Sequence, residues 1–240
     1  MTTATCQAIE NSSSAQHASE DRALANSPYP QASISERLYS LTDIYQDEIN
    51  LAVWQRTLPD SLTAALEAHL ASQPPIRLSV VLSPEEAEVE LIQHLKGMAG
   101  GSQLAEKLAE VLAELVDVFC CLFELERAGL RLTTLDSAMC PKFHVDKVPC
   151  RLVSTLIGPG SEWLENHWLN REGLGAGAEH HALYPTNAEI QHLNNGDVAL
   201  FKGERWIGNE GRGLVHRSPA VETGAGQLGK RLILTLDFAD

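Results

Sequence analysis

The sequence predicts an α+β protein in which an acidic, helical first half precedes an antiparallel β-sandwich or barrel. Apolar residues recur at helical spacing between residues 61 and 128. After residue 130, short β-rich segments alternate with Gly and Pro turns, and the absence of a repeating helical pattern between them disfavours a βαβ sheet. The charge divides at the same place, because residues 1–130 hold 7 basic and 19 acidic side chains, whereas residues 131–240 hold 11 and 13.

The composition excludes several classes of protein. The 240 residues carry a formal charge of −14, and binding to nucleic-acid phosphates requires a basic surface. No apolar run approaches the roughly 20 residues of a membrane span, and the N-terminus lacks the basic start and apolar segment of a secretory signal. We therefore expect a cytoplasmic protein with reduced cysteines that binds neither nucleic acid nor membrane. The oligomeric state cannot be predicted from the sequence.

The first third of the chain divides into a tail and a mixed segment. Residues 1–32 are rich in Ser, Ala, Gln, Asn and Thr without apolar periodicity, which predicts a disordered tail. Residues 34–57 fit one helix or a short strand, and the pattern does not choose between them. We expect residues 33–129 to form a helical region that packs on a barrel formed by residues 130–240.

Helix and strand signals follow in order through this helical region. Asp60 is predicted to cap a helix over residues 61–73, and the β-branched stretch 76–82 predicts a strand. Ser83 begins a capping box with proline at the first helical position, which predicts a second helix. A third, amphipathic helix is predicted over residues 102–128.

The second half contains β-rich segments bounded by turns. The predicted strands are residues 130–135, 150–158, 197–203, 213–218 and 231–238.

The most informative residues for chemistry are His144 and Asp146. They are two positions apart, so on a strand both side chains point to the same face. If that face lines the interior of a barrel, an imidazole and a carboxylate converge there. The alternative is an ion pair on the protein surface.

A second segment, residues 196–219, carries His216, and Arg231 opens the last strand fifteen residues later. Two imidazoles and one carboxylate can occupy one face of a metal octahedron and leave three positions free, which suits non-haem Fe(II). Arg231 would offer a fixed fork to a ligand carboxylate, a contact of about 1.5–3 kcal/mol. Strand alternation predicts that Arg151 and Arg217 point away from the two histidines.

Several sequence blocks carry a resemblance to known families. These blocks are CPKFHVDKVPCRL, GPGSEWL, GDVALFKGERW, GNEGRGLVHRSP and RLILTLDF. Through them, residues 130–238 resemble an uncharacterised bacterial family, domain of unknown function 1826, which brings no established activity. The order of the His-x-Asp pair, the distal His and the following Arg also resembles the Fe(II)/2-oxoglutarate dioxygenases of the double-stranded β-helix, or jelly-roll, fold.

The dioxygenase resemblance implies a fold and a set of roles. The fold would be a jelly-roll barrel buttressed by the N-terminal helices. His144, Asp146 and His216 would bind Fe(II), and Arg231 would bind the far carboxylate of 2-oxoglutarate, whose keto-acid end chelates the iron. The implied activity is a hydroxylase-type dioxygenase, with a small molecule or a protein as its unknown substrate.

The sequence departs from the dioxygenase pattern after this arginine. These enzymes often place Ser or Thr two residues after the Arg to help hold the cosubstrate, and here Ile233 stands at that position. Thr235, two residues further on, is the candidate for this role.

Two other functions remain open at this point. Cys140 and Cys150 flank the His–Asp pair, and soft thiolates favour zinc over iron. The alternative function is therefore a non-catalytic metal-binding protein of the same fold, in zinc or iron homeostasis, and a third is a degenerate barrel used for protein association. We expect His180 and His181 to lie in a solvated loop, and we interpret the acidic run at residues 85–90 as a solvated helix start.

Overall fold

A seven-stranded sheet forms the centre of the molecule, in a computed structural model that describes residues 28–98, 101–174, 183–221, 223–224 and 227–239. The strand order is β1-β2-β8-β5-β12-β4-β3. The bounds are β1 (Gln31–Ser35), β2 (Ile49–Trp54), β3 (Arg77–Leu82), β4 (Ala128–Leu135), β5 (Cys150–Ile157), β8 (Val198–Lys202) and β12 (Arg231–Phe238). Only the pair β1–β2 of this sheet is parallel, and the other neighbours are antiparallel.

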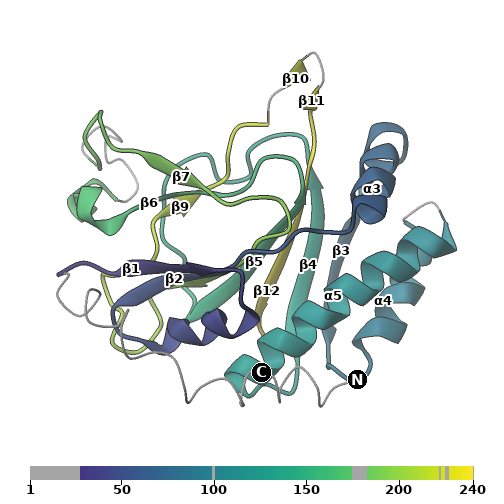
Figure 1. Ribbon diagram of the computed structural model, residues 1–240, viewed down its shortest axis with the longest axis horizontal. Coiled ribbons are helices and arrows are strands. Elements are labelled where there is room, and N and C mark those ends of the chain that lie inside the picture. Colours follow the sequence, from purple (N-terminus) through teal and green to yellow (C-terminus); the bar gives the residue numbers. More distant parts are fainter. Residues whose placement is uncertain (1–27, 99–100, 175–182, 222, 225–226, 240) are drawn as a thin grey trace.

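Three helices cover one face of this sheet (Figure 1). They are α3 (Asp60–Ser72), α4 (Ala87–Lys96) and α5 (Ser102–Phe123). Side chains alternate along each strand, so every second residue of β5 and β12 faces the helices. Leu152 and Leu234 lie on this side and are fully buried, together with Leu112 and Phe119 of α5. The principal core therefore lies between the sheet and the helices.

A smaller sheet lies on the other side of the large one (Figure 1). Its order is β7-β6-β9, with β7 (Ile190–His192), β6 (Glu162–Leu164) and β9 (His216–Arg217). Between the two sheets lies a second apolar cluster, which joins Trp163 of β6 to Val153 of β5 and Phe201 of β8. The two sheets therefore face each other.

Short elements complete the described chain. They are the 3-10 helices η1 (Leu38–Tyr45), η2 (Asn166–Trp168) and η3 (Arg171–Gly173), and the hairpin of β10 (Thr223–Gly224) and β11 (Gln227–Leu228).

The N-terminal third contributes strands as well as helices. Residues 34–57, which the sequence left open, contain the end of β1, the helix η1 and the strand β2. β2 joins the large sheet by pairing with β8, and β3 joins it at the opposite edge. Of the predicted tail, residues 1–27 lie outside the described residues, whereas Gln31 and Ala32 belong to β1. The division of the chain at residues 129 and 130 stays a prediction.

The long helix ends earlier than the sequence predicts. It stops at Phe123, and Glu124 adopts the left-handed conformation with φ of 54°. The expectation that it continues to residue 128 is wrong because Ala128 already pairs with Phe238 at the start of β4. Pairing with β12 and burial of Ala128 outweigh the local helical pattern there.

Two further findings bear on the composition arguments. No helix in the described part of the chain is long and apolar enough to cross a membrane. Cys121 is disulfide-bonded, whereas Cys140 and Cys150 carry free thiols. The expectation that all cysteines are reduced is therefore wrong for Cys121.

Candidate metal centre

His144, Asp146 and His216 come together beside the smaller sheet. His144 Nε2 lies 3.8 Å from Asp146 Oδ1, and His216 Nε2 lies 3.8 Å from Asp146 Oδ2. Within the described residues, these three are the one group of three or more His, Cys, Asp or Glu side chains that could hold a metal ion, with ligand atoms within 4.8 Å of one another. Neighbouring ligands of an octahedral ion with bonds of about 2.0–2.2 Å lie roughly 3 Å apart, so side-chain movements of about 1 Å would close the site.

The backbone fixes the two histidines against each other. His144 N donates to His216 O and His216 N donates to His144 O, each at 3.0 Å, which makes an isolated antiparallel bridge. This pairing extends the smaller sheet and places the two ring centroids 4.5 Å apart. The strand carrying His216 is only two residues long, shorter than the predicted segment 213–218.

Asp146 is held by the loop that follows β8. Its carbonyl oxygen accepts from Glu204 N at 2.9 Å. Gly203 allows this close approach, because a Cβ there would lie 2.1 Å from Val148 O and 2.8 Å from Asp146 O. A residue other than glycine would therefore push the loop away from the segment that carries Asp146.

Both histidines present the same ring nitrogen to Asp146. Nδ1 of His144 lies 3.0 Å from Lys142 O, and Nδ1 of His216 lies 3.2 Å from Leu214 O. A carbonyl oxygen can only accept, so Nδ1 carries the proton and Nε2 keeps its lone pair. This tautomer is the one that a metal ion at Nε2 requires.

His216 is neutral at neutral pH. Its side chain is 10% exposed and its ring packs on Phe201 at a centroid distance of 4.6 Å. Burial lowers the pKa of His216 to about 4, and the nearby carboxylate of Asp146 offsets this only in part. No proton has to leave His216 before it binds a cation at pH 7.

Arg151 contacts Asp146, contrary to the prediction from strand alternation. Its Nη1 donates to Asp146 Oδ2 at 2.8 Å. The prediction was wrong because the chain turns between Asp146 and Cys150, so the alternation does not run from His144 into β5. Burial lowers the pKa of Arg151, but its two aspartate partners, Asp146 and Asp237, more than compensate and the net shift is upward.

Arg217 points away from the histidine pair, as predicted. Its Nε donates to Glu162 on β6, and its guanidinium lies over the ring of Phe143.

Arg231 is buried on the face of the large sheet that looks toward the smaller sheet. It is 1% exposed, and its Nη2 donates to Thr155 Oγ1 at 2.9 Å and to Ser161 Oγ at 2.8 Å. Among the described residues, the buried Nε and Nη1 find no hydrogen-bond partner. Burial lowers the pKa of Arg231 to about 10, so the side chain stays charged at neutral pH. A buried cation with two unpaired donors fits a negatively charged ligand.

Two further positions of β12 share the face of Arg231. Alternation along the strand places Ile233 and Thr235 there. Ile233 packs against the apolar cluster that contains Trp163, whereas Thr235 is half-buried and pairs in register with Val153. Thr235 thus lies on the same face of β12 as Arg231, between Arg231 and Asp237.

The remaining candidates lie apart from the triad formed by His144, Asp146 and His216. Cys140 is exposed, and Cys150 is buried on the helix-facing side of β5, where burial raises the pKa of its thiol. Neither cysteine belongs to the candidate metal group. His180 and His181 lie outside the described residues.

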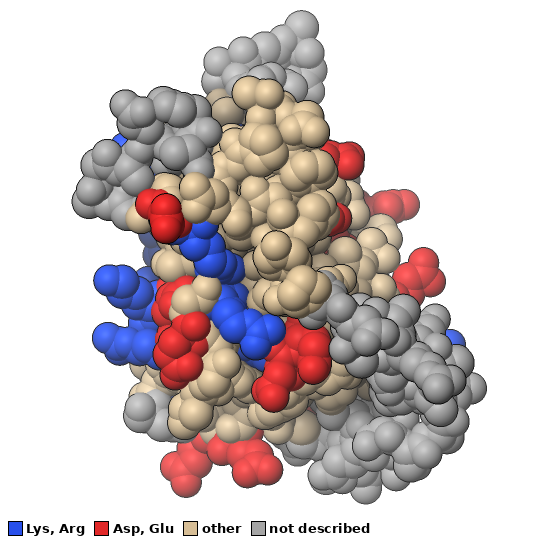
Figure 2. Space-filling view, turned by 90° about the vertical axis from the view of Figure 1, so that its left-hand side faces the viewer, with Lys and Arg blue, Asp and Glu red and all other residues tan. Residues whose placement is uncertain are grey.

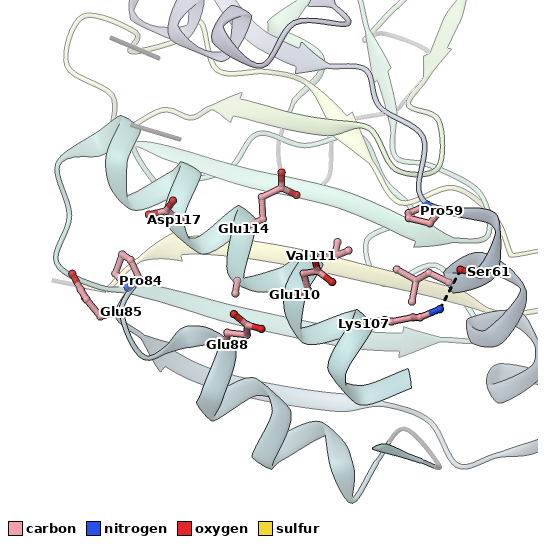
Figure 3. A pocket seen from close by; sticks show the side chains of 12 residues that line it. Pro59, Ser61, Pro84, Glu85, Glu88, Lys107, Glu110, Val111, Glu114 and Asp117 are labelled. Carbon is pink, nitrogen blue, oxygen red and sulfur yellow. Dashed lines mark hydrogen bonds between the residues drawn. The ribbon is translucent and has the colours of Figure 1, made fainter. Parts of the chain in front are cut away.

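A separate groove of about 550 Å³ lies over α5 and the start of α4 (Figure 3). Carboxylates from both segments line it, and Lys107 Nζ donates to Ser61 Oγ at one end. Glu85 and Glu88 of the acidic run are exposed there. None of the triad residues lines this groove, so it is distinct from the candidate metal centre.

The charges on one face of the molecule are mixed. Figure 2 shows a band of Lys and Arg side chains with Asp and Glu side chains on both sides of it. Opposite charges are thus interspersed on this face rather than gathered into one basic surface.

Comparisons with known proteins give a family and several similar structures. No curated protein matches the chain. It is similar to the dioxygenase for auxin oxidation of rice, at 14% identity over 88% of this chain and 82% of that one, with a TM-score of 0.46. It is also similar to a putative 2OG-Fe(II) oxygenase family protein of Caulobacter crescentus, at 14% identity over 88% and 87%, with a TM-score of 0.47. A Pseudomonas putida prolyl-4-hydroxylase is 13% identical over 85% and 100%, with a TM-score of 0.42.

The family model described as protein of unknown function (DUF1826) matches residues 35–237. This match covers most of the chain, including all three triad residues and Arg231. The protein therefore belongs to the DUF1826 family.

Proposed function

We propose that the protein is an Fe(II)- and 2-oxoglutarate-dependent dioxygenase of hydroxylase type, with a substrate still to be identified. One observation carries the proposal: a His–Asp–His cluster accompanies a buried arginine, Arg231, that has two unpartnered N–H groups. The first feature suits a divalent metal and the second suits a carboxylate. A protein that only binds metal has no need for the second.

The strand order supports a jelly-roll barrel as the fold. In chain order the eight segments are β4, the His144 segment, β5, β6, β7, β8, β9 and β12. The large sheet contains the first, eighth, third and sixth, and the smaller sheet contains the second, seventh, fourth and fifth. Two facing sheets connected in this way are expected of a double-stranded β-helix.

The donor set fits Fe(II). Two imidazole nitrogens and one carboxylate oxygen form the facial arrangement that leaves three positions of an octahedron open. A bound Fe(II) ion would supply the oxygen chemistry. The chain itself contributes two imidazoles that present Nε2 to the site and one carboxylate, and it shelters His216 from water.

Arg231 fits the far carboxylate of 2-oxoglutarate. Thr155 and Ser161 accept from Nη2, which leaves Nε and Nη1, on either side of the guanidinium, as the donors for a ligand. A buried cation with open donors suits an anionic group such as a carboxylate. In this proposal Thr235, on the same face, gives the cosubstrate a further hydroxyl.

The alternative function is a non-catalytic metal-binding protein of the same fold. One observation favours it: Trp163, Phe201 and Ile233 pack together between the two sheets, where a cosubstrate would need space. The two functions differ at Arg231, which binds the 2-oxoglutarate carboxylate in the enzyme and has no cosubstrate in the metal-binding protein. The function in metal homeostasis also predicts that Cys140→Ser weakens metal binding. If the triad alone holds the metal, this substitution should leave metal binding unchanged.

A calorimetric titration of 2-oxoglutarate into anaerobic, Mn(II)-loaded protein tests the proposal. We expect metal-dependent binding that Arg231→Ala weakens at least tenfold, about 1.4 kcal/mol. Arg131→Ala, an exposed position on β4, is the matched control and should leave binding unchanged. If Mn(II) binds and 2-oxoglutarate does not, the non-catalytic function replaces the enzyme.

A further inference from the structure

Asp146, Arg151 and Asp237 form a connected group of charges beside the candidate metal centre. Arg151 Nη1 donates to Asp146 Oδ2 at 2.8 Å. Its Nε donates to Asp237 Oδ1 at 2.7 Å, and its Nη2 donates to Asp237 Oδ2 at 3.1 Å. One guanidinium thus uses both of its edges, with two bonds to Asp237 and one to Asp146.

We infer that Arg151 is a positioning residue that restricts Asp146 to binding the metal through one oxygen. This inference rests on the proposed function. Asp146 Oδ2 lies 3.8 Å from His216 Nε2 and accepts from Arg151, whereas Oδ1, 3.8 Å from His144 Nε2, is the oxygen that Arg151 leaves to an ion. A carboxylate with both oxygens free can bind a cation through either one or two of them.

The number of ligands makes this restriction matter. An octahedral ion has six positions, and the triad takes three of them when Asp146 binds through one oxygen. A keto-acid chelate takes two more, which leaves one for oxygen. If Asp146 bound through both oxygens, that last position would be lost. Arg151 therefore protects the position at which oxygen would bind.

Asp237 acts through Arg151. The antiparallel register aligns Leu236 with Leu152, so the next residues, Asp237 and Arg151, lie opposite each other on the same face of the sheet. The two parallel hydrogen bonds fix the plane of the guanidinium. Asp237 also balances the charge of Arg151, which would otherwise have to share the single carboxylate of Asp146 with a divalent cation.

Co(II) binding to the full chain tests this arrangement, because Co(II) absorption reports the number and geometry of its ligands. The variants are Arg151→Gln, Asp237→Asn and the double variant. The matched control is Arg56→Gln, which removes a partly buried arginine from its ion pair with Glu114 at a site distant in sequence. Thermal unfolding of each metal-free variant records the loss of stability separately from metal binding.

We expect Arg151→Gln to weaken Co(II) binding about 10- to 100-fold, as changes to residues behind metal ligands commonly do. Its visible absorption spectrum should change, because a second carboxylate oxygen would replace a water molecule in the ligand set. Asp237→Asn should shift both readouts in the same direction. The Co(II) affinity of the double variant should equal that of Arg151→Gln within about twofold, since Asp237 affects the metal only through Arg151.

An Arg151→Gln variant with wild-type Co(II) affinity and spectrum would overturn the inference, and so would fully additive effects of the two changes. Failure of the proposed function gives a different result. In that case the Co(II)-loaded wild-type protein would not bind 2-oxoglutarate, whatever the outcome for Arg151→Gln. Wild-type Co(II) affinity in His144→Ala, which removes a ligand, would instead show that the three residues are not the metal site. Unchanged binding by Arg56→Gln alongside a changed spectrum in Arg151→Gln supports the positioning role.

Discussion

The two faces of strands β5 and β12 differ sharply. The face toward the helices carries Ser154 and otherwise apolar residues, among them Leu152, Leu156, Leu232, Leu234 and Leu236, all fully buried. The face toward the smaller sheet carries Arg151, Thr155, Arg231, Thr235 and Asp237 among a few apolar residues. The same two segments of chain therefore build a conventional core on one side and a charged interior on the other.

The two faces differ in what their buried residues contribute to the free energy of folding. Burial of leucine stabilises the fold by roughly 1.5–3 kcal/mol per side chain. A buried arginine costs free energy unless its donors are paired, and two donors of Arg231 are not. The proposed function assigns the cost of these charges to ligand binding on the face toward the smaller sheet, whereas the opposite face stabilises the fold.

The largest effect is expected on the helix-facing side. Leu234→Ala should lower the free energy of unfolding by about 2–5 kcal/mol, because it leaves a cavity against the helices. Urea denaturation measures this, and calorimetry of the protein that remains folded should show unchanged Mn(II) affinity. A change in metal affinity as large as the change in stability would mean that the two faces are coupled.

Removal of either Arg231 or its hydrogen-bond acceptors tests how much stability the buried charge costs. Thr155→Val and Ser161→Ala each remove an acceptor from a buried cation, and each should destabilise the protein by about 1.5–3 kcal/mol. Arg231→Met removes the cation itself and should be neutral or stabilising. Urea denaturation of the three variants without ligand compares them. A large loss of stability in Arg231→Met would show that the arginine serves the fold.

Lys202 of the neighbouring strand β8 is a buried charged residue, and it makes the stability of the protein depend on pH. It is 1% exposed, with Nζ donating to Gln46 O, and burial lowers its pKa from 10.5 to about 8. Between these two values the unfolded chain binds more protons, so stability should rise as the pH increases from about 8 toward 10.5. Lys202→Met should lack this rise. Parallel pH profiles of urea unfolding in the two proteins would contradict the lowered pKa.

The smallest effect is expected at Thr235. If its hydroxyl contacts 2-oxoglutarate, Thr235→Val should weaken cosubstrate binding by about 0.5–1.5 kcal/mol, the net value of one hydrogen bond. Mn(II) affinity should not change. Calorimetry under the conditions used for Arg231→Ala measures both constants. Equal affinity for 2-oxoglutarate in Thr235→Val and the wild-type protein would remove Thr235 from the site.

Local patterns predicted the elements that local interactions form. Residues 231–238 were predicted as a strand and form β12, because alternating apolar residues are recognisable in isolation. The spacing of His144 and Asp146, together with His216 on a later segment, predicted three side chains that the structure brings within 4.8 Å. The family resemblance supplied the pairing of the His-x-Asp motif with its distal histidine.

Contacts between distant segments were beyond such patterns. Residues 34–57 fitted a helix or a strand, and pairing of β2 with β8 decided for a strand at Ile49–Trp54. Arg151 was assigned to the wrong face because strand parity holds only within a continuous strand. An arginine and an aspartate facing each other across β5 and β12 become visible only once the register is known.

The sequence by itself determined the order of the helices and most strands, the acidic first half and the identity of the candidate ligands, since these depend on composition and short-range periodicity. Tertiary structure decided where α5 ends, which segments extend the large sheet, and that Arg151 and Asp237 stand behind Asp146. Most of these features depend on pairings between segments far apart in the sequence, such as Arg151 with Asp237, which are 86 positions apart. Their free energy arises only when the sheets assemble, so no short stretch of sequence contains them.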